Sequence, residues 1–170
     1  VGVVLADLGL NLPDFRAPER TFQLLTQVAG RAGRGNERGN VIIQSYEPDH
    51  YAIQAAMRQD YRGFYERELE LRRAHGNPPV TRLIRLLFGH SKPNQAGNEA
   101  QRMASALRRA AREWDISDIN VIGPAPGYPP RIRGAWRWQL FVRGTDPVLL
   151  LGKVDLPPGA IDVVDPVNVV

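Results

Sequence analysis

Hydrophobic residues recur along the chain at two different spacings, which divide it into predicted strands and helices. Short runs rich in Val and Ile are typical of buried strands, and apolar residues every three to four positions are typical of helices. In the first third of the chain, this pattern predicts strands over 1–6 and 41–46 and a helix over 18–34 between them. A strand, a helix and a strand in that order indicate a parallel α/β unit. Two strands and one helix cannot close a stable core by themselves, so we expect the tail of a larger lobe.

Two further helical patterns occupy residues 48–73. In the second of them Glu and Arg side chains mix at helical spacing, which is typical of a solvated face. We therefore interpret 48–76 as a helical connector. It ends at Gly76-Asn77-Pro78-Pro79, because two consecutive prolines cannot continue a helix and push the preceding residues into extended conformations.

Beyond these prolines the pattern changes to short strands around one long helix. Strands are predicted over 80–88, 119–122, 136–142 and 161–164, a helix over 94–114, and a short helical piece over 147–154. The order β-α-β-β-α-β is that of a split βαβ, ferredoxin-like sandwich. Residues 123–133 are rich in Pro and Gly and are predicted to form a loop. The predicted fold class is α/β (α+β), with a parallel α/β lobe end over 1–47, the connector over 48–76 and a ferredoxin-like domain over 77–170.

Each of the two main helices carries an apolar face that should pack on a core. The face of the first helix is formed by Phe22, Leu25, Val28 and Ala29. The face of the long helix is formed by Ala96, Ala100, Met103, Ala104, Leu107, Ala111 and Trp114.

Composition narrows the class of protein. There are no cysteines, so disulfides and thiolate metal sites are excluded, and no apolar run approaches the ~18 residues that a membrane span needs. The net charge is +4, and the whole excess lies in residues 76–170, with twelve Lys and Arg against eight Asp and Glu. A basic C-terminal part is typical of contact with a polyanion.

Polar side chains share one face at the end of the first predicted helix. Gln27, Arg31 and Arg34 are spaced i, i+4, i+7, which makes a rigid array of donors suited to a triphosphate. Gly30 and Gly33 lie beside them and allow a ligand to approach the backbone closely. An alternative interpretation is an ordinary helix end, with glycine caps and solvated arginines that stabilise the helix dipole.

The segment 26–35 contains Q-V-A-G-R-A-G-R-G and resembles motif VI of superfamily 2 helicases. The preceding segment, A-D-L-G-L-N-L-P-D-F-R-A-P-E-R over 6–20, resembles the same region of the primosomal protein N′ family, the PriA replication-restart helicases. G-P-A-P over 123–126 and R-G-A-W-R-W-Q over 133–139 resemble that family's C-terminal domain, which is likened to ribosomal protein S ten. The motif alone is specific only to the superfamily, whereas the flanking segments are specific to the family.

This resemblance implies that Gln27, Gly30, Arg31 and Arg34 belong to an ATP site. Arg31 and Arg34 would face the γ-phosphate and act catalytically, and Gln27 would couple nucleotide state to lobe closure. The family's phosphate loop, Mg²⁺-binding carboxylates and zinc-binding cysteines are not in this sequence and are expected upstream of Val1. The implied partners are single-stranded or forked DNA, single-strand DNA-binding protein and other primosome proteins. The implied location is the bacterial cytoplasm, in association with the nucleoid.

Residues 129–139 form a second candidate site, with three arginines, two tryptophans and no acid. Guanidinium groups bind phosphates and aromatic rings stack on bases, so this composition suits single-stranded nucleic acid. Strand alternation places Trp136 with Trp138 on the face expected to be core, so Arg131, Arg133 and Arg137 are the better contact candidates, and Trp136 is kept as the fourth. Alternatively, these arginines are a solvated strand edge.

Two functions follow from these patterns. The first is the C-terminal portion of an ATP-dependent DNA helicase that restarts stalled replication forks. The second is a non-enzymatic nucleic-acid or protein-binding module, because a ferredoxin-like sandwich supports many unrelated functions.

Overall fold

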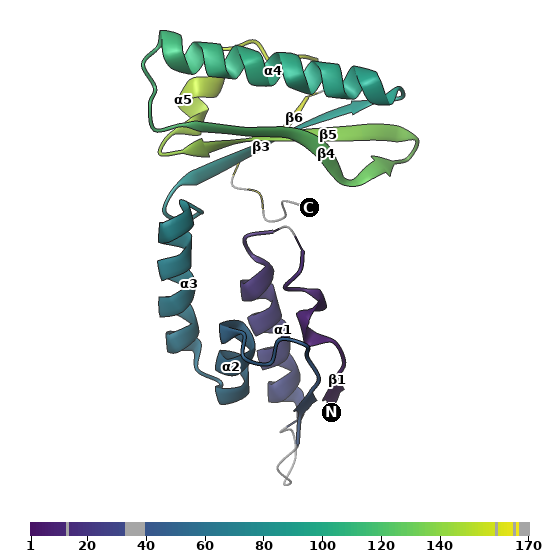
Figure 1. The fold of residues 1–170 in the computed structure, drawn as a ribbon, viewed down its shortest axis with the longest axis vertical. Helices are drawn as coiled ribbons and strands as arrows, with labels where there is room; N and C mark the ends of the chain where they lie inside the picture. The colour runs from purple at the N-terminus through teal and green to yellow at the C-terminus, as the bar shows by residue number, and fades with distance from the viewer. Residues whose placement is uncertain (13, 33–39, 159, 165, 167–170) are drawn as a thin grey trace. The chain divides into compact units, whose positions relative to one another are not determined.

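A computed structural model describes residues 1–12, 14–32, 40–158, 160–164 and 166 (Figure 1). The described chain forms two compact units, Val1–Ala74 and His75–Val170. The predicted helix over 18–34 and the polar array at its end therefore fall partly outside the described residues.

The first unit is a short parallel strand pair with four helical segments. Its elements are β1 (Gly2–Val3), the 3-10 helix η1 (Ala6–Leu8), α1 (Ala17–Ala32), β2 (Ile42–Ile43), α2 (Tyr51–Arg58) and α3 (Tyr61–His75). β1 and β2 pair in parallel, with Gly2 opposite Ile42 and Val3 opposite Ile43, and α1 lies between them in sequence. The predicted parallel unit is confirmed. Its strands are shorter than predicted, since the chain turns into η1 at Ala6.

Aromatic and small side chains form the core of the first unit. Its buried members are Phe22, Leu25, Ala52, Ile53, Ala55, Ala56 and Phe64. Phe22 of α1 stacks on Phe64 of α3, with ring centroids 4.2 Å apart and planes within 6° of parallel. Alanines on α2 let that helix approach α1 closely. The predicted apolar face of α1 is correct at Phe22 and Leu25, whereas Val28 and Ala29 are only half-buried.

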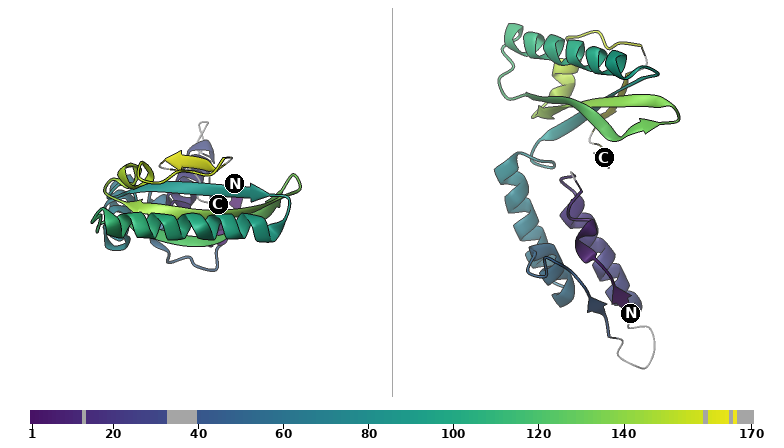
Figure 2. Two further views of the ribbon diagram at one scale, coloured as in Figure 1. Left: turned by 90° about the horizontal axis from the view of Figure 1, so that it is seen from above. Right: turned by 45° about the vertical axis from the view of Figure 1, so that its right-hand side comes forward.

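The second unit is a four-stranded antiparallel sheet with helices over one face (Figures 1 and 2). Its elements are β3 (Arg82–His90), α4 (Pro93–Glu113), β4 (Asn120–Ile132), β5 (Ala135–Gly144), α5 (Pro147–Leu151) and β6 (Ile161–Val164). The strand order is β4-β5-β3-β6. β3 and β4 are thus parallel with β5 between them, and β5 and β6 are parallel with β3 between them. These are the two split βαβ units of a ferredoxin-like fold, which confirms the prediction, including the short second helix.

The core of this unit lies between the sheet and α4. It contains Ile84, Leu86, Phe88, Ala100, Met103, Ala104, Leu107, Ala110, Leu140, Val142 and Leu150, with Trp138 packed against its edge. The ring of Trp138 lies against Gly97 of α4, where an added Cβ would come within 3.1 Å of the indole. The predicted core position of Trp138 is therefore confirmed.

The prediction of a loop over 123–133 is wrong, because β4 continues through the Pro- and Gly-rich stretch to Ile132. β4 is the outer strand of the described sheet, so a proline there removes no hydrogen bond that an inner strand would need. Two register shifts, between Ile122 and Ala125 and between Pro126 and Arg131, accommodate the irregular backbone.

The core position predicted for Trp114 is also wrong, since its side chain is 58% exposed. α4 ends at Glu113, and Trp114 is its C-cap residue, so the helical periodicity no longer directs the ring into the core. The indole lies instead beneath the ammonium group of Lys153, 3.8 Å from the ring centroid, in a cation–π contact.

Candidate nucleotide and nucleic-acid sites

Asp14 anchors the start of α1, the helix that carries the polar array. Its Oδ1 accepts a hydrogen bond from the Arg16 backbone N–H at 2.9 Å, and its Oδ2 pairs with Arg20 at 2.9 Å. Its backbone carbonyl accepts from the Ala17 N–H at 2.9 Å. A buried carboxylate at a helix N-terminus satisfies free N–H groups and stabilises the helix dipole. The entry into α1 is therefore fixed by directional bonds.

Asp7 performs a similar function in η1, between the two strands. The buried carboxylate accepts hydrogen bonds from the Ser45 hydroxyl and from the Tyr46 N–H, the latter at 2.9 Å. These bonds, that from Ser45 above all, hold the pKa of Asp7 below its ordinary value. Asp7 thus ties the segment after β1 to the segment after β2.

The second half of α1 presents the polar face predicted from the spacing. Gln27, Gly30 and Arg31 are all exposed, and Arg34 lies outside the described residues. Within the described part of the chain, the Gln27 and Arg31 side chains have no hydrogen bond or ion pair to the protein. Their donors face solvent and are available to an anion. The residues present therefore fit the phosphate groups of ATP, with Arg31 as the charged donor and Gly30 leaving the backbone open.

The β4–β5 hairpin brings together two of the four residues proposed for nucleic-acid contact. Arg131 and Trp136 are directly opposite each other, and the Arg131 guanidinium lies 5.4 Å from the Trp136 ring centroid. Arg131 is exposed and Trp136 is half-buried. A guanidinium over an indole offers a cation and a planar surface at the same place, which is the combination that binds a nucleotide.

The other two arginines lie apart from this pair. Arg133 is exposed in the turn, with φ +49°, followed by Gly134 with φ +84°, and two successive positive φ values are typical of a type I′ hairpin. Arg137 follows Trp136 directly in β5, so strand alternation directs it to the opposite face of the sheet. The hairpin therefore presents cations around its tip rather than on one face.

A buried ionic network was missed by reasoning from the sequence. The connector helix was predicted to be a solvated face, but Glu68 of α3 is buried and Arg72 is half-buried, with side chains only 9% and 11% exposed. Arg72 bonds to Glu68 on its own helix and to Glu19 on α1. The available signal was the spacing of Phe64, Glu68 and Arg72, which places two charges on the apolar face of α3.

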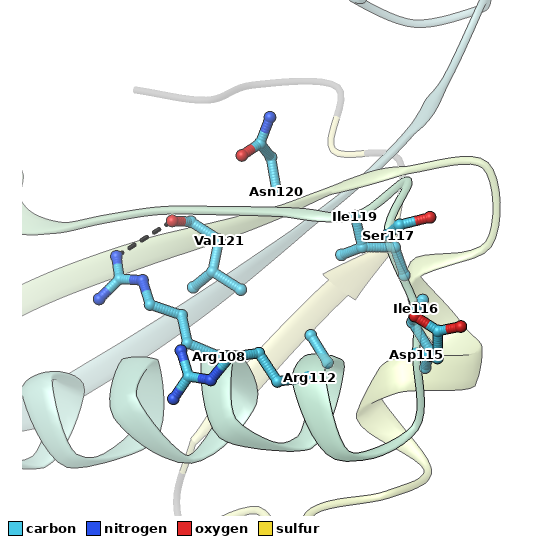
Figure 3. A pocket seen from close by; sticks show the side chains of 9 residues that line it. Arg108, Arg112, Asp115, Ile116, Ser117, Ile119, Asn120 and Val121 are labelled. Atoms are coloured by element: carbon cyan, nitrogen blue, oxygen red, sulfur yellow. Dashed lines mark hydrogen bonds between the residues drawn. The ribbon is translucent and has the colours of Figure 1, made fainter.

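A hollow of about 400 Å³ lies between the end of α4 and the start of β4 (Figure 3). Arg108 lies at its edge and donates to the backbone carbonyls of Val121 at 3.0 Å and Gly123 at 2.7 Å. These bonds tie the side chain of Arg108 on α4 to the backbone of β4. Arg108 is thereby committed to the fold, and the hollow is lined by none of the residues proposed for binding.

No group of three or more His, Asp or Glu side chains in the described part of the chain is placed to hold a metal ion. None of the described helices is long and apolar enough to cross a membrane.

Comparison with known proteins establishes the class of the second unit. Residues 73–150 match the family described as primosomal protein N C-terminal domain. The matched segment runs from the end of α3 through α5, so it includes the hairpin and most of the sheet.

Relatives extend this match to the first unit. The chain is 40% identical over 143 residues to the replication restart protein PriA of Bacillus subtilis, which is 84% of this chain and 17% of that protein. It is 42% identical over 144 residues to PriA of Synechocystis, with coverage of 84% and 17%. With PriA of Treponema pallidum it is 40% identical over 178 residues, with coverage of 99% and 26%. The chain belongs to the PriA family and corresponds to its C-terminal portion. It spans between 17% and 26% of the length of these relatives.

Proposed function

We propose that this chain is the C-terminal part of an ATP-dependent DNA helicase that restarts stalled replication forks. The observation that carries the proposal is the similarity to proteins named replication restart protein PriA over 84–99% of the chain. A role in replication restart requires access to DNA at a fork and assembly with replication proteins. Single-strand DNA-binding protein and other primosome components are the proposed partners, in the bacterial cytoplasm at the nucleoid.

In this proposal the exposed face of α1 contributes to the ATP site. Gln27, Gly30 and Arg31, together with Arg34, bind the phosphate groups, and ATP with Mg²⁺ supplies the chemical energy for strand separation. Arg31 and Arg34 stabilise the negative charge that develops at the γ-phosphate. The metal-binding carboxylates, the phosphate loop and the zinc site belong to other parts of the full-length protein.

The second unit binds DNA through the tip of the β4–β5 hairpin. Arg131, Arg133 and Arg137 neutralise phosphates, and the pair formed by Arg131 and Trp136 contacts a base or sugar. Support comes from the charge, since residues 119–145 contain four arginines and no Asp or Glu. A single strand bound there would be held by phosphate contacts without sequence preference.

Strand separation by the full-length protein tests this function. A forked duplex should be unwound in the presence of ATP and Mg²⁺ and should remain intact when ATP is omitted or replaced by a non-hydrolysable analogue. A protein that binds the fork tightly and never separates its strands would contradict the proposal and favour a non-enzymatic binding module.

A further inference from the structure

Arg72 joins three helices of the first unit through one guanidinium group and its neighbours. Its Nη2 donates to Glu19 of α1 at 2.8 Å, and its Nε donates to Glu68 of α3 at 2.7 Å. The second oxygen of Glu68 accepts a hydrogen bond of 2.5 Å from the Tyr51 hydroxyl of α2. The Phe15 ring covers the guanidinium, 5.2 Å away. The network therefore runs from the first turn of α1 through α3 to the first turn of α2.

This network is less exposed than the other ion pairs on α3, because the side chains of Glu68, Arg72 and Glu19 are 9%, 11% and 33% exposed. Arg62–Glu66 and Arg67–Glu70 are exposed pairs, and exposed pairs contribute little to stability. Burial alone would lower the pKa of Arg72, but the bonds to Glu68 and Glu19 outweigh burial and raise it. Buried charges are tolerated only in a narrow range of geometries, since a lost partner leaves an uncompensated charge. Arg72 consequently restricts how α1 can lie against α3.

The Arg72 network joins α1, which carries Arg31, to α3, which leads to the second unit. Glu19 is in the first turn of α1 and Arg31 in its last turn, about 18 Å further along the helix at 1.5 Å per residue. α3 is the last helix of the first unit, and the chain continues from it directly into the second unit. Arg72 thus bonds α1 to the helix from which the chain continues into the second unit.

We propose that Arg72 is a positioning residue that couples the nucleotide face of α1 to the C-terminal unit, so that DNA binding stimulates ATP hydrolysis. The inference rests on the proposed function of α1. The stacked rings of Phe22 and Phe64 also join α1 to α3, but an apolar stack is not directional. The stack holds the helices together when Arg72 is replaced, whereas the hydrogen bonds of the guanidinium fix their register.

The test compares Arg72→Gln with the control Arg67→Gln in the full-length protein. Each change removes one arginine from α3. Arg72 belongs to the bridge to Glu19 and Glu68, whereas Arg67 belongs to an exposed pair with Glu70. ATPase turnover and the KM for ATP are measured with and without single-stranded DNA, together with DNA affinity and melting temperature. For Arg72→Gln we expect unstimulated turnover and DNA affinity within about twofold of wild type, and DNA stimulation reduced about tenfold, within the range of allosteric couplings. Arg67→Gln should match wild type in every measurement.

Two further variants test whether the paired hydrogen bonds of the Arg72 guanidinium are required. Arg72→Lys keeps the charge, but a single ammonium nitrogen cannot occupy both positions of the guanidinium, so stimulation should not be restored. Adding Glu19→Gln to Arg72→Gln should cause no further loss, because both changes break the same bridge.

Three results would contradict the proposed coupling by Arg72. Stimulation within about twofold of wild type in Arg72→Gln would overturn it, given coupling factors of five or more. Parallel loss of stimulated and unstimulated turnover, with a lower melting temperature, would show a merely structural role and also overturn it. A wild-type protein without DNA-stimulated ATPase would instead overturn the proposed function itself, and this inference with it.

Discussion

Gly144, near the end of β5, has no room for a side chain. A Cβ at this position would lie 2.6 Å from the backbone carbonyl oxygen of Asp118 and 2.8 Å from Ile119. We predict that Gly144→Ala destabilises the second unit by about 1–3 kcal/mol, the usual cost of overpacking. Gly89 on β3 is the matched control, since nothing lies within 4 Å of an added Cβ. Denaturant unfolding of both variants checks this, and equal stability for the two would contradict the packing described at Gly144.

His50 caps α2 and should make the stability of the first unit depend on pH. Its Nδ1 accepts a hydrogen bond from the Ala52 N–H at 3.2 Å, which requires a neutral ring. Burial lowers the pKa of His50 below its ordinary value, despite Glu47 and Glu68 nearby. The unfolded chain then binds the proton more readily, so this stability is complete above about pH 6.5 and is lost as the pH falls through the folded-state pKa.

The matched replacement is Asn, which also caps helices but does not titrate. We predict that His50→Asn unfolds with less dependence on pH between about 7.5 and 5 than the wild type, measured by denaturant unfolding at each pH. His50→Ala should lose about 1 kcal/mol at neutral pH through loss of the cap. An identical pH profile for His50→Asn and wild type would show that another group is responsible.

At the scale of elements, the proposed DNA contacts lie on the β4–β5 hairpin. Replacing Arg131, Arg133 and Arg137 by Ala should weaken single-stranded DNA binding by this chain. The slope of log affinity against log salt should flatten by up to about two units, at roughly 0.7 per phosphate contact. Binding measured over a series of salt concentrations checks this.

The outer face of α4 provides the control with the same change in charge. Arg102, Arg109 and Arg112 are exposed there, and their replacement by Ala should leave the salt slope unchanged. If both triple variants flatten the slope equally, binding follows net charge, and the hairpin is not a specific contact.

Elements were predicted well where local pattern decides the structure. The apolar periodicity of α4 and the alternation in β5 were sufficient to place Leu107 and Leu140 in the core and Trp138 against it. The extent of β4 could not be predicted, because its prolines are tolerated only at a sheet edge, and strand order is a tertiary property. The Arg72 bridge was missed for a similar reason, since Glu19 and Arg72 are 53 positions apart in sequence.

At the scale of the whole molecule, helical spacing predicted where the candidate side chains lie, whereas the family resemblance predicted which ligand they bind. Spacing alone placed Gln27 and Arg31 on one exposed face of α1, as the structure has them. Their assignment to ATP came from the resemblance, because an exposed arginine near a helix end has the same local pattern whether it binds phosphate or only solvent. The fold adds that α1 is anchored at its other end by Asp14 and Arg72.

The proposed role of Arg31 in ATP hydrolysis can be measured in the full-length protein. We compare DNA-stimulated ATP hydrolysis by wild type, Arg31→Ala and Arg58→Ala. Arg58 is the control, since it is also an exposed arginine in the last turn of a helix, where it bonds only to Gln54 among the described residues. We expect Arg31→Ala to lose about 10³-fold in turnover, the usual scale for an arginine at the γ-phosphate, with DNA affinity and stability retained. Arg58→Ala should resemble wild type. Turnover of Arg31→Ala within a few-fold of wild type would contradict the account and leave Arg31 as a solvated cation at the end of α1.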